Sequence, residues 1–218
     1  MTALAGRRAF VTGGSSGIGA ATVAALADAG ACVAAPTRVL CDVRDADSVT
    51  RAVDAAARDM GGLDLVVAAA GLGRFARAEE MSVADFDEVV AVDLRGTYVV
   101  FRAALPHVRR SCGHLFALSS IAGLRPFASS AAYCAAKAGV RSLAQVIAEE
   151  NRRDGVRVTT LVIGSVDTPF WDRAGGTQLA RERMLRPEDV ARAIVETAAR
   201  PAGVSIDEIS ILPADGVL

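Results

Sequence analysis

A tyrosine and a lysine four residues apart are the side chains in this sequence best placed to do acid–base chemistry. Tyr133 and Lys137 lie in the run Ala-Ala-Tyr-Cys-Ala-Ala-Lys-Ala-Gly, whose alanine content predicts a helix, and residues i and i+4 of a helix share one face. A neighbouring ammonium favours the phenolate, so we expect Lys137 to lower the pKa of Tyr133 from about 10 toward the range of general acid–base catalysis. The alternative is an ordinary helix, because so short a pattern is common by chance.

A serine precedes this pair at the end of an apolar run. Residues 115–118 predict a buried strand, and Ser120 closes it. Open α/β sheets bind ligands at the carboxyl ends of their strands. We therefore expect the hydroxyl of Ser120 at that edge of a sheet, and a loop serine without function is the alternative.

A glycine-rich turn lies near the start of the chain. Residues 8–12 predict a strand, Gly13-Gly14-Ser15-Ser16-Gly17-Ile18-Gly19 follow at once, and the alanine-rich residues 20–29 predict a helix. A dinucleotide site has this order, because glycines allow the backbone close to a pyrophosphate whose charge the helix N-terminus meets. The spacing Gly-x-x-x-Gly-x-Gly differs from the commoner Gly-x-Gly-x-x-Gly, and a purely structural turn is the alternative.

Taken together, the glycine turn and then Ser120, Tyr133 and Lys137 resemble the short-chain dehydrogenase/reductase family. The resemblance implies an α/β fold: a single-domain Rossmann-type doubly wound parallel sheet of about seven strands, with helices on both faces. One domain covering residues 1–218 would bind the dinucleotide and carry out catalysis. The resemblance further implies hydride transfer between a nicotinamide cofactor and a carbonyl or alcohol substrate.

Composition agrees with a folded chain and excludes several classes of protein. The sequence is 52% hydrophobic and has a net charge of -1, which gives no basic surface for nucleic acid. No apolar run approaches the roughly 18 residues that span a bilayer, and no apolar signal core precedes the first predicted strand. We expect a cytoplasmic protein that binds neither nucleic acid nor membranes. The cysteines have no metal-ligand spacing, so we expect no metal site; they are Cys32, Cys41, Cys112 and Cys134.

Predicted strands alternate with predicted helices, which favours a parallel sheet covered on both faces. The predicted strands are residues 8–12, 31–35, 39–42, 63–69, 114–119, 156–162 and 206–212. The predicted helices are residues 17–29, 46–60, 83–110, 130–153 and 187–199. Ser82 predicts the start of the third helix, with Asp85 three residues on.

One connection is too short. About three residues separate the second predicted strand from the third, whereas a parallel crossover needs roughly a dozen. Members of the family usually have a helix there. Either the chain lacks that helix and the two strands connect unusually, or part of the chain is absent from the sequence.

The residue at the end of the second predicted strand indicates whether the cofactor is NAD or NADP. An acid there would bind the ribose hydroxyls of NAD, whereas a cation suits the extra phosphate of NADP. This chain has Thr37 and then Arg38, which favours NADP(H) over NAD(H); a solvated arginine is the alternative. Asp42 and Val43 match the family's Asp-Val that meets the adenine, and helix capping before Ala46 is the alternative for the aspartate.

Two family landmarks are altered. Where members commonly have Asn-Asn-Ala-Gly, residues 68–71 are Ala-Ala-Ala-Gly, which keeps room for the cofactor but removes amide groups that brace the strand. Asp93 stands where the family usually has an asparagine that helps to hold a water next to the lysine. A carboxylate accepts from that water but cannot donate, and it would lie near the cationic Lys137. We expect an altered pH profile.

The resemblance assigns roles to individual residues. Ser120 would bind the substrate oxygen, Tyr133 would transfer the proton, and Lys137 would tune the tyrosine and bind the nicotinamide ribose, with Asp93 completing the catalytic group. After the sixth strand, residues 163–164 are Ile-Gly in place of the usual Pro-Gly. The expected cofactor-binding residues are Gly13, Ser15, Ser16, Gly17, Ile18, Gly19, Arg38, Asp42, Val43, Ala69, Ala70, Gly71, Tyr133, Lys137, Gly164, Val166 and Thr168.

The segments that would contact the substrate say less about its identity. In the family the segment after Thr168 forms a lid, and residues 170–186 here contain Phe170, Trp171 and several arginines. The aromatic rings could line an apolar pocket. The arginines could meet an anionic substrate or form a solvated face with Glu182. Residues 124–127 would form the opposite wall, and the short segment suggests a small or open-sided substrate.

Three hypotheses about function follow. The first is an NADPH-dependent ketone or aldehyde reductase acting on a small molecule. The second is a non-catalytic dinucleotide-binding or partner-binding protein on the same fold, favoured by Asp93, the alanines at 68 and 69 and the missing crossover. The third is an NAD-dependent alcohol dehydrogenase. By resemblance we also expect a homodimer or homotetramer associating through the helices at 93–110 and 130–153.

Overall fold

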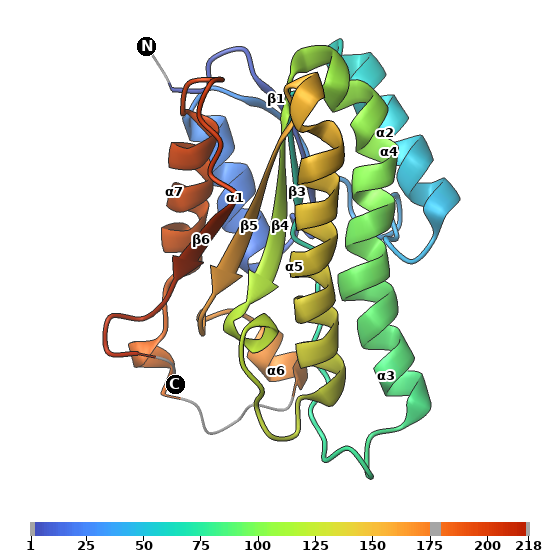
Figure 1. The fold of residues 1–218 in the computed structure, drawn as a ribbon, viewed down its shortest axis with the longest axis vertical. Helices are drawn as coiled ribbons and strands as arrows, with labels where there is room; N and C mark the ends of the chain where they lie inside the picture. The colour runs from blue at the N-terminus through green and yellow to red at the C-terminus, as the bar shows by residue number, and fades with distance from the viewer. Residues whose placement is uncertain (1–2, 175–179, 217–218) are drawn as a thin grey trace.

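A parallel sheet with helices on both faces forms the framework of the protein (Figure 1). The computed structural model describes residues 3–174 and 180–216. Within them the strand order is β2-β1-β3-β4-β5-β6, and every neighbouring pair is parallel. The strands are β1 (Arg8–Thr12), β2 (Cys32–Ala34), β3 (Leu65–Ala68), β4 (His114–Ser120), β5 (Arg157–Ile163) and β6 (Glu208–Ile211).

The helices account for the crossovers between these strands. They are α1 (Gly17–Asp28), α2 (Ala46–Met60), α3 (Val83–Val89), α4 (Gly96–Ser111), α5 (Ala131–Asn151), α6 (Phe170–Ala174) and α7 (Pro187–Ala198). In the described part of the chain, none of them is long and apolar enough to cross a membrane. The strand arrows of Figure 1 point toward α6, so α6 marks the carboxyl edge of the sheet.

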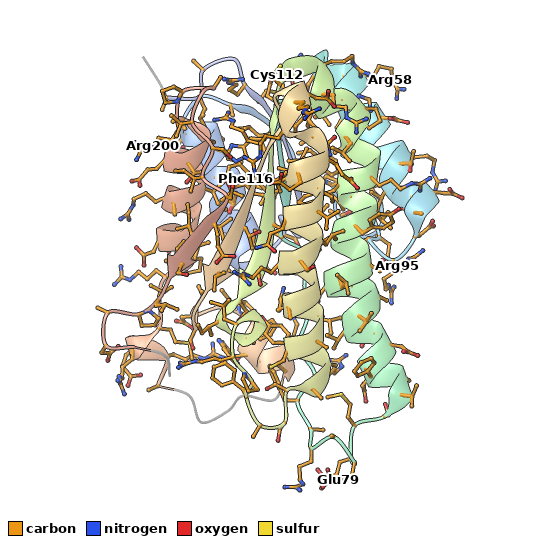
Figure 2. The ribbon with its side chains drawn as sticks, in the orientation of Figure 1. Arg58, Glu79, Arg95, Cys112, Phe116 and Arg200 are labelled. Carbon is orange, nitrogen blue, oxygen red and sulfur yellow. The ribbon has the colours of Figure 1, made fainter. Side chains whose placement is uncertain are left out.

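Two cores lie on opposite faces of the sheet, because successive side chains of a strand point to opposite sides. Phe10 of β1 packs with residues of α2, α4 and α5, whereas Val11 packs with residues of α1 and α7. In β4, Leu115 belongs to the first core and Phe116 to the second. Figure 2 labels Phe116 between the helix layers, where it is fully buried. Burial of both faces explains why the strands are nearly continuous apolar runs.

The expected strands are confirmed except for the third. Residues 39–42 form no strand: Leu40 N and Cys41 N both donate to Thr37 O at 2.9 Å, which closes a turn. Val39 is 92% exposed. β2 is therefore the edge of the sheet, and the chain passes through this loop into α2 and crosses over β1 to β3. The connection that was too short for two parallel strands is long enough for a loop that leads into a helix.

The predicted helix over 83–110 is one helical run with a change of winding in the middle. Ser82 Oγ accepts from Asp85 N at 3.0 Å and begins α3, as expected. Residues 90–95 form a π-helix that contains Asp93, and α4 follows directly. Single π turns inside α-helices are frequent at functional sites. The short helix α6 was not predicted, because five residues carry too little periodicity.

Candidate active site

A cavity of about 960 Å³ opens at the carboxyl edge of the sheet. The strand order reverses between β1 and β3, since β2 lies on the other side of β1, and ligands of open α/β sheets bind at such a reversal. The structure brings all of the predicted site residues to this cavity. It is lined by Gly13, Ser15, Ser16, Gly17, Ile18, Gly19, Arg38, Asp42, Val43, Ala69, Ala70, Gly71, Asp93, Ser120, Tyr133, Lys137, Gly164, Val166 and Thr168.

The glycine turn lies tightly against the end of β3. Gly13 has a φ of +68°, and a Cβ there would lie 2.7 Å from Ala70 N. A Cβ on Gly19 would lie 2.1 Å from Gly13 O, so only glycine fits. α1 begins at Gly17 and has no capping hydrogen bond from the Ser16 side chain. Its first amide groups are therefore free of a side-chain cap, as an anion site at a helix N-terminus requires.

The three residues expected to do chemistry come from two adjacent elements. Ser120 is the last residue of β4, and Tyr133 and Lys137 are one turn apart in α5. Lys137 Nζ lies 5.4 Å from the centre of the Tyr133 ring and donates to Leu118 O at 3.1 Å. Ser119 Oγ donates to Lys137 O at 2.9 Å, which ties α5 to the end of β4.

Asp93 connects this pair to the loop that follows β3. Its Oδ2 lies 2.8 Å from Lys137 Nζ, and its Oδ1 accepts from Leu72 N at 2.9 Å. Asp93 is 1% exposed and Lys137 is 7% exposed, so this is a buried ion pair. The expectation that a carboxylate at 93 lies near the lysine is confirmed. The Asp93–Leu72 hydrogen bond also braces the loop from which the family's asparagines are missing.

The electrostatics of Tyr133 differ from expectation. Its pKa is raised above the ordinary value: burial is the largest cause and Asp93 adds to it, while Lys137 and a hydrogen bond with Ser120 act in the opposite direction. The predicted net lowering by Lys137 is therefore wrong, because burial and the carboxylate outweigh the ammonium. Burial lowers the pKa of Lys137, but Asp93 and Tyr133 raise it above its ordinary value overall. The lysine is thus a permanent cation at neutral pH.

A cluster of charges lies where the shortened loop enters the cavity. Arg44 donates from Nε to Asp42 Oδ1 at 3.0 Å and from Nη2 to Oδ2 at 2.6 Å, and Arg38 Nε lies 3.5 Å from Asp42. The hydrogen bonds from Arg44 hold the pKa of Asp42 far below its ordinary range. Asp42 does not cap α2; Asp45 does, accepting from Asp47 N at 2.9 Å.

Arg44 lines the same cavity, and sequence reasoning missed it. Arg95 of the π-helix donates to Arg44 O at 2.7 Å and fixes this part of the loop. A basic residue two positions after the matched aspartate was the available signal. Two arginines and one aspartate give the cluster a net positive charge.

Aromatic side chains form the wall around Tyr133. The rings of Phe75 and Phe170 each have their centres 5.7 Å from that of Tyr133. Phe170 and Trp171 were expected here, whereas Phe75, in the loop after β3, was not. Phe127 lines the cavity as expected, but Leu124 is 46% exposed and does not.

Two of the four arginines in the segment after Thr168 are paired with aspartates. Arg181 bonds to Asp167 at 3.2 Å and to Asp172, and Arg183 bonds to Asp215 at 2.7 Å. Glu182 and Arg183 are exposed and Arg181 is partly exposed, which agrees with the solvated face rather than with an anionic-substrate site. Arg173 lines the rim of the cavity and is exposed to solvent.

Comparison with known proteins decides the family. The family model described as short chain dehydrogenase matches residues 36–178, well over half of the chain. The chain belongs to the short-chain dehydrogenase/reductase family. It is therefore an oxidoreductase of a family whose members bind a nicotinamide dinucleotide.

Relatives of similar length support this membership. An uncharacterized oxidoreductase of Staphylococcus epidermidis is 30% identical over 224 residues, covering 94% of this chain and 96% of the relative. An uncharacterized oxidoreductase of Staphylococcus aureus is 31% identical over 233 residues, covering 98% and 100%.

Two solved structures of the family have closely similar folds. An alcohol dehydrogenase from the archaeon Thermococcus sibiricus, complexed with 5-hydroxy-NADP, has a TM-score of 0.85 and 28% identity, covering 95% of this chain and 97% of the other. A dehydrogenase/reductase from Sinorhizobium meliloti has a TM-score of 0.84 and 32% identity, covering 95% and 94%.

Proposed function

We propose that this protein is an NADPH-dependent reductase of ketones or aldehydes that uses Ser120, Tyr133 and Lys137. One observation carries the proposal: these three residues line the same cavity as the glycine turn and the arginine cluster. The tight cradle at Gly13 and Gly19 and the uncapped N-terminus of α1 fit the phosphates of a dinucleotide. When bound, the nicotinamide would supply the hydride.

The chain's own residues would position the substrate and move the proton. Ser120 would donate a hydrogen bond to the substrate oxygen and orient it. Tyr133 would then give its phenolic proton to that oxygen, and its raised pKa keeps it protonated, as a general acid must be. Lys137 would stabilise the phenolate that remains, because Asp93 keeps the lysine charged. Gly164, Val166 and Thr168 would hold the nicotinamide end.

NADP(H) is the proposed cofactor because of Arg38 and Arg44. Asp42 carries the carboxylate that would repel a phosphate, and both arginines contact it. Their net positive charge favours the phosphate on the adenosine ribose of NADP(H). The 5-hydroxy-NADP in the Thermococcus sibiricus structure supports this choice by analogy.

A parallel titration with NADPH and NADH, followed by cofactor fluorescence, tests this choice. We expect NADPH to bind at least about 10-fold more tightly than NADH, which is about 1.4 kcal/mol. Arg38→Ala and Arg44→Ala should each weaken the binding of NADPH and leave the affinity for NADH unchanged. Arg58→Ala, in the exposed C-terminal turn of α2 and outside the cavity, serves as the control. Equal binding of both cofactors would favour the NAD-dependent hypothesis.

Gly19→Ala should abolish cofactor binding. The new Cβ would lie 2.1 Å from Gly13 O, so the glycine turn must open or shift. Gly203→Ala is the matched control, because its Cβ would meet nothing within 4 Å. We expect fluorescence titration to show at least a 100-fold weaker affinity for Gly19→Ala, which is about 2.7 kcal/mol, and no change for Gly203→Ala. Wild-type affinity of Gly19→Ala would mean that the turn does not hold the phosphates.

One observation favours a second candidate function. The buried Asp93–Lys137 pair holds the lysine by a carboxylate at the position where the family usually has an amide. A non-catalytic dinucleotide-binding protein would tolerate such a change, because it needs no proton transfer. Substitution of Tyr133, described in the Discussion, separates the two.

The protein is further proposed to act in the cytoplasm as a homodimer or homotetramer. α4 and α5 would form the interface, and each carries a half-exposed apolar residue, Tyr98 and Val146. We expect light scattering to give the mass of two or four chains for the wild type. Val146→Glu should lower this mass, since it would bury a charge in the interface. A single-chain mass for the wild type would contradict this part of the proposal.

A further inference from the structure

Four aromatic rings gather at the substrate end of the cavity. The chain has 7 Phe, 2 Tyr and 1 Trp. Phe75 and Phe170 each contact both Tyr133 and Trp171 as well as one another, which joins the four rings into one cluster. Phe75 and Trp171 are stacked, with centres 6.1 Å apart and planes at 20°. Phe170 meets Trp171 edge to face at 5.2 Å. Stacked and edge-to-face contacts fix the orientation of each ring, so the cluster offers flat faces in defined positions as well as apolar surface.

These rings are not part of the buried core. Phe10, Phe101 and Phe116 are fully buried between the layers, whereas the rings of Phe75 and Trp171 are half-buried and line the cavity. They come from the loop after β3, from α5 and from α6, so the tertiary fold builds the cluster. Their partly exposed surfaces are available to a ligand lying beside the Tyr133 hydroxyl.

Two details hold the rings in place. Trp171 Nε1 donates to Val166 O at 3.0 Å, which fixes the plane of the indole. A Cβ on Gly73 would lie 2.6 Å from Cζ of Phe170, so the loop after β3 approaches this ring as closely as glycine allows. Pre-positioned rings lose little entropy when a ligand binds.

The charges around the cluster are largely compensated. Arg74, in the same loop as Phe75, pairs with Glu88 at 2.9 Å and with Asp85 at 3.4 Å. Arg181 is paired with Asp167 and Asp172. Arg173 also lines the cavity, but it is exposed at the rim, where water solvates it. The environment next to Tyr133 therefore suits an uncharged, flat, apolar group.

We propose that the substrate is an uncharged aldehyde or ketone with an aryl group on its carbonyl carbon, and that Phe75, Phe170 and Trp171 bind this aryl group. The inference rests on the proposed reductase function and adds the substrate class. The carbonyl carbon gains a hydride from NADPH, which becomes NADP⁺, and the carbonyl oxygen gains the proton of Tyr133. The products are an aryl alcohol and NADP⁺, and the tyrosine regains its proton from solvent.

Two aldehydes of similar size test the inference: benzaldehyde and cyclohexanecarbaldehyde. The quantity to measure is the ratio of their kcat/KM values in wild type divided by the same ratio in each variant, because the different intrinsic reactivities of the two aldehydes then cancel. We expect the aryl preference to fall about 2- to 12-fold in Phe75→Leu and in Trp171→Leu, since an aromatic pair contributes about 0.5–1.5 kcal/mol beyond burial. Leucine keeps much of the apolar volume, and circular dichroism confirms that each variant folds.

The control is Phe86→Leu, a half-exposed ring on α3 that does not line the cavity. It should leave the ratio unchanged. An unchanged ratio in both Phe75→Leu and Trp171→Leu, with both aldehydes still reduced, would overturn the aryl inference and leave the reductase proposal intact. No turnover of either aldehyde by the wild type would overturn the reductase proposal and the inference with it.

Discussion

Tyr133→Phe lowers kcat for carbonyl reduction by about 1,000-fold and leaves the affinity for NADPH within about twofold, because a positioned general acid contributes about 10²- to 10⁴-fold. Phenylalanine keeps the ring, and with it the contacts to Phe75 and Phe170, but it has no proton to give. Steady-state kinetics and fluorescence titration on the same preparation measure the two quantities.

Tyr98→Phe is the matched control for this variant. Tyr98 is the chain's other tyrosine and is 46% exposed on α4. Its substitution should change neither kcat nor cofactor affinity. A Tyr133→Phe protein with wild-type turnover would rule out proton transfer by Tyr133. An unchanged biological activity in the absence of turnover would favour the non-catalytic hypothesis.

Asp93→Ala lowers the free energy of unfolding by about 3–5 kcal/mol, because it leaves the buried Lys137 without its counter-charge. Denaturant unfolding followed by circular dichroism measures this loss. Asp93→Asn should lower the free energy of unfolding by less, since its amide oxygen can still accept a hydrogen bond from Leu72 N. Asp87→Asn, which changes an exposed carboxylate on α3, should have little effect.

The same position sets the pH dependence of the reaction. Asp93 raises the pKa of Tyr133 and that of Lys137. Removing its charge in Asp93→Asn therefore lowers the pKa of the tyrosine. Reduction needs the protonated phenol, and activity is lost as the pH rises through its pKa. The alkaline limb of the kcat/KM profile should move to lower pH in Asp93→Asn. A limb that stays in place would mean that the carboxylate does not act on Tyr133.

The fold was largely predictable because its strands are buried on both faces. Residues 8–12 and 114–119 each have an apolar centre, Ala-Phe-Val and Leu-Phe-Ala-Leu, and the structure confirms them as β1 and β4. The false strand at 39–42 begins with the apolar residues Val39, Leu40 and Cys41, but Val39 and Leu40 are exposed. Local composition cannot distinguish a buried strand from an exposed turn when both contain valine and leucine. Only the short connection to the preceding strand indicated the error.

The location of the site residues was predictable from the sequence, whereas the direction of the Tyr133 pKa was not. Every predicted catalytic and cofactor-binding residue lines the cavity, because sequence motifs fix which strand ends and helix turns meet; of the expected wall at 124–127 only Phe127 does so. Arg44 and Phe75 were missed, since each reaches the cavity through a loop whose path depends on tertiary contacts such as Arg95 to Arg44 O. The direction of the Tyr133 pKa was also missed, because burial depends on the folded packing around the ring.

A deuterium-transfer measurement tests the central claim most directly. The purified protein is mixed with benzaldehyde, cyclohexanecarbaldehyde and NADPH that carries deuterium at its transferable position, and the alcohols are analysed by mass spectrometry. We predict one deuterium on the carbinol carbon of the product from the wild type and almost no labelled alcohol from Tyr133→Phe. Tight NADPH binding by the wild type with no labelled alcohol from either aldehyde would contradict the assignment of a carbonyl reductase.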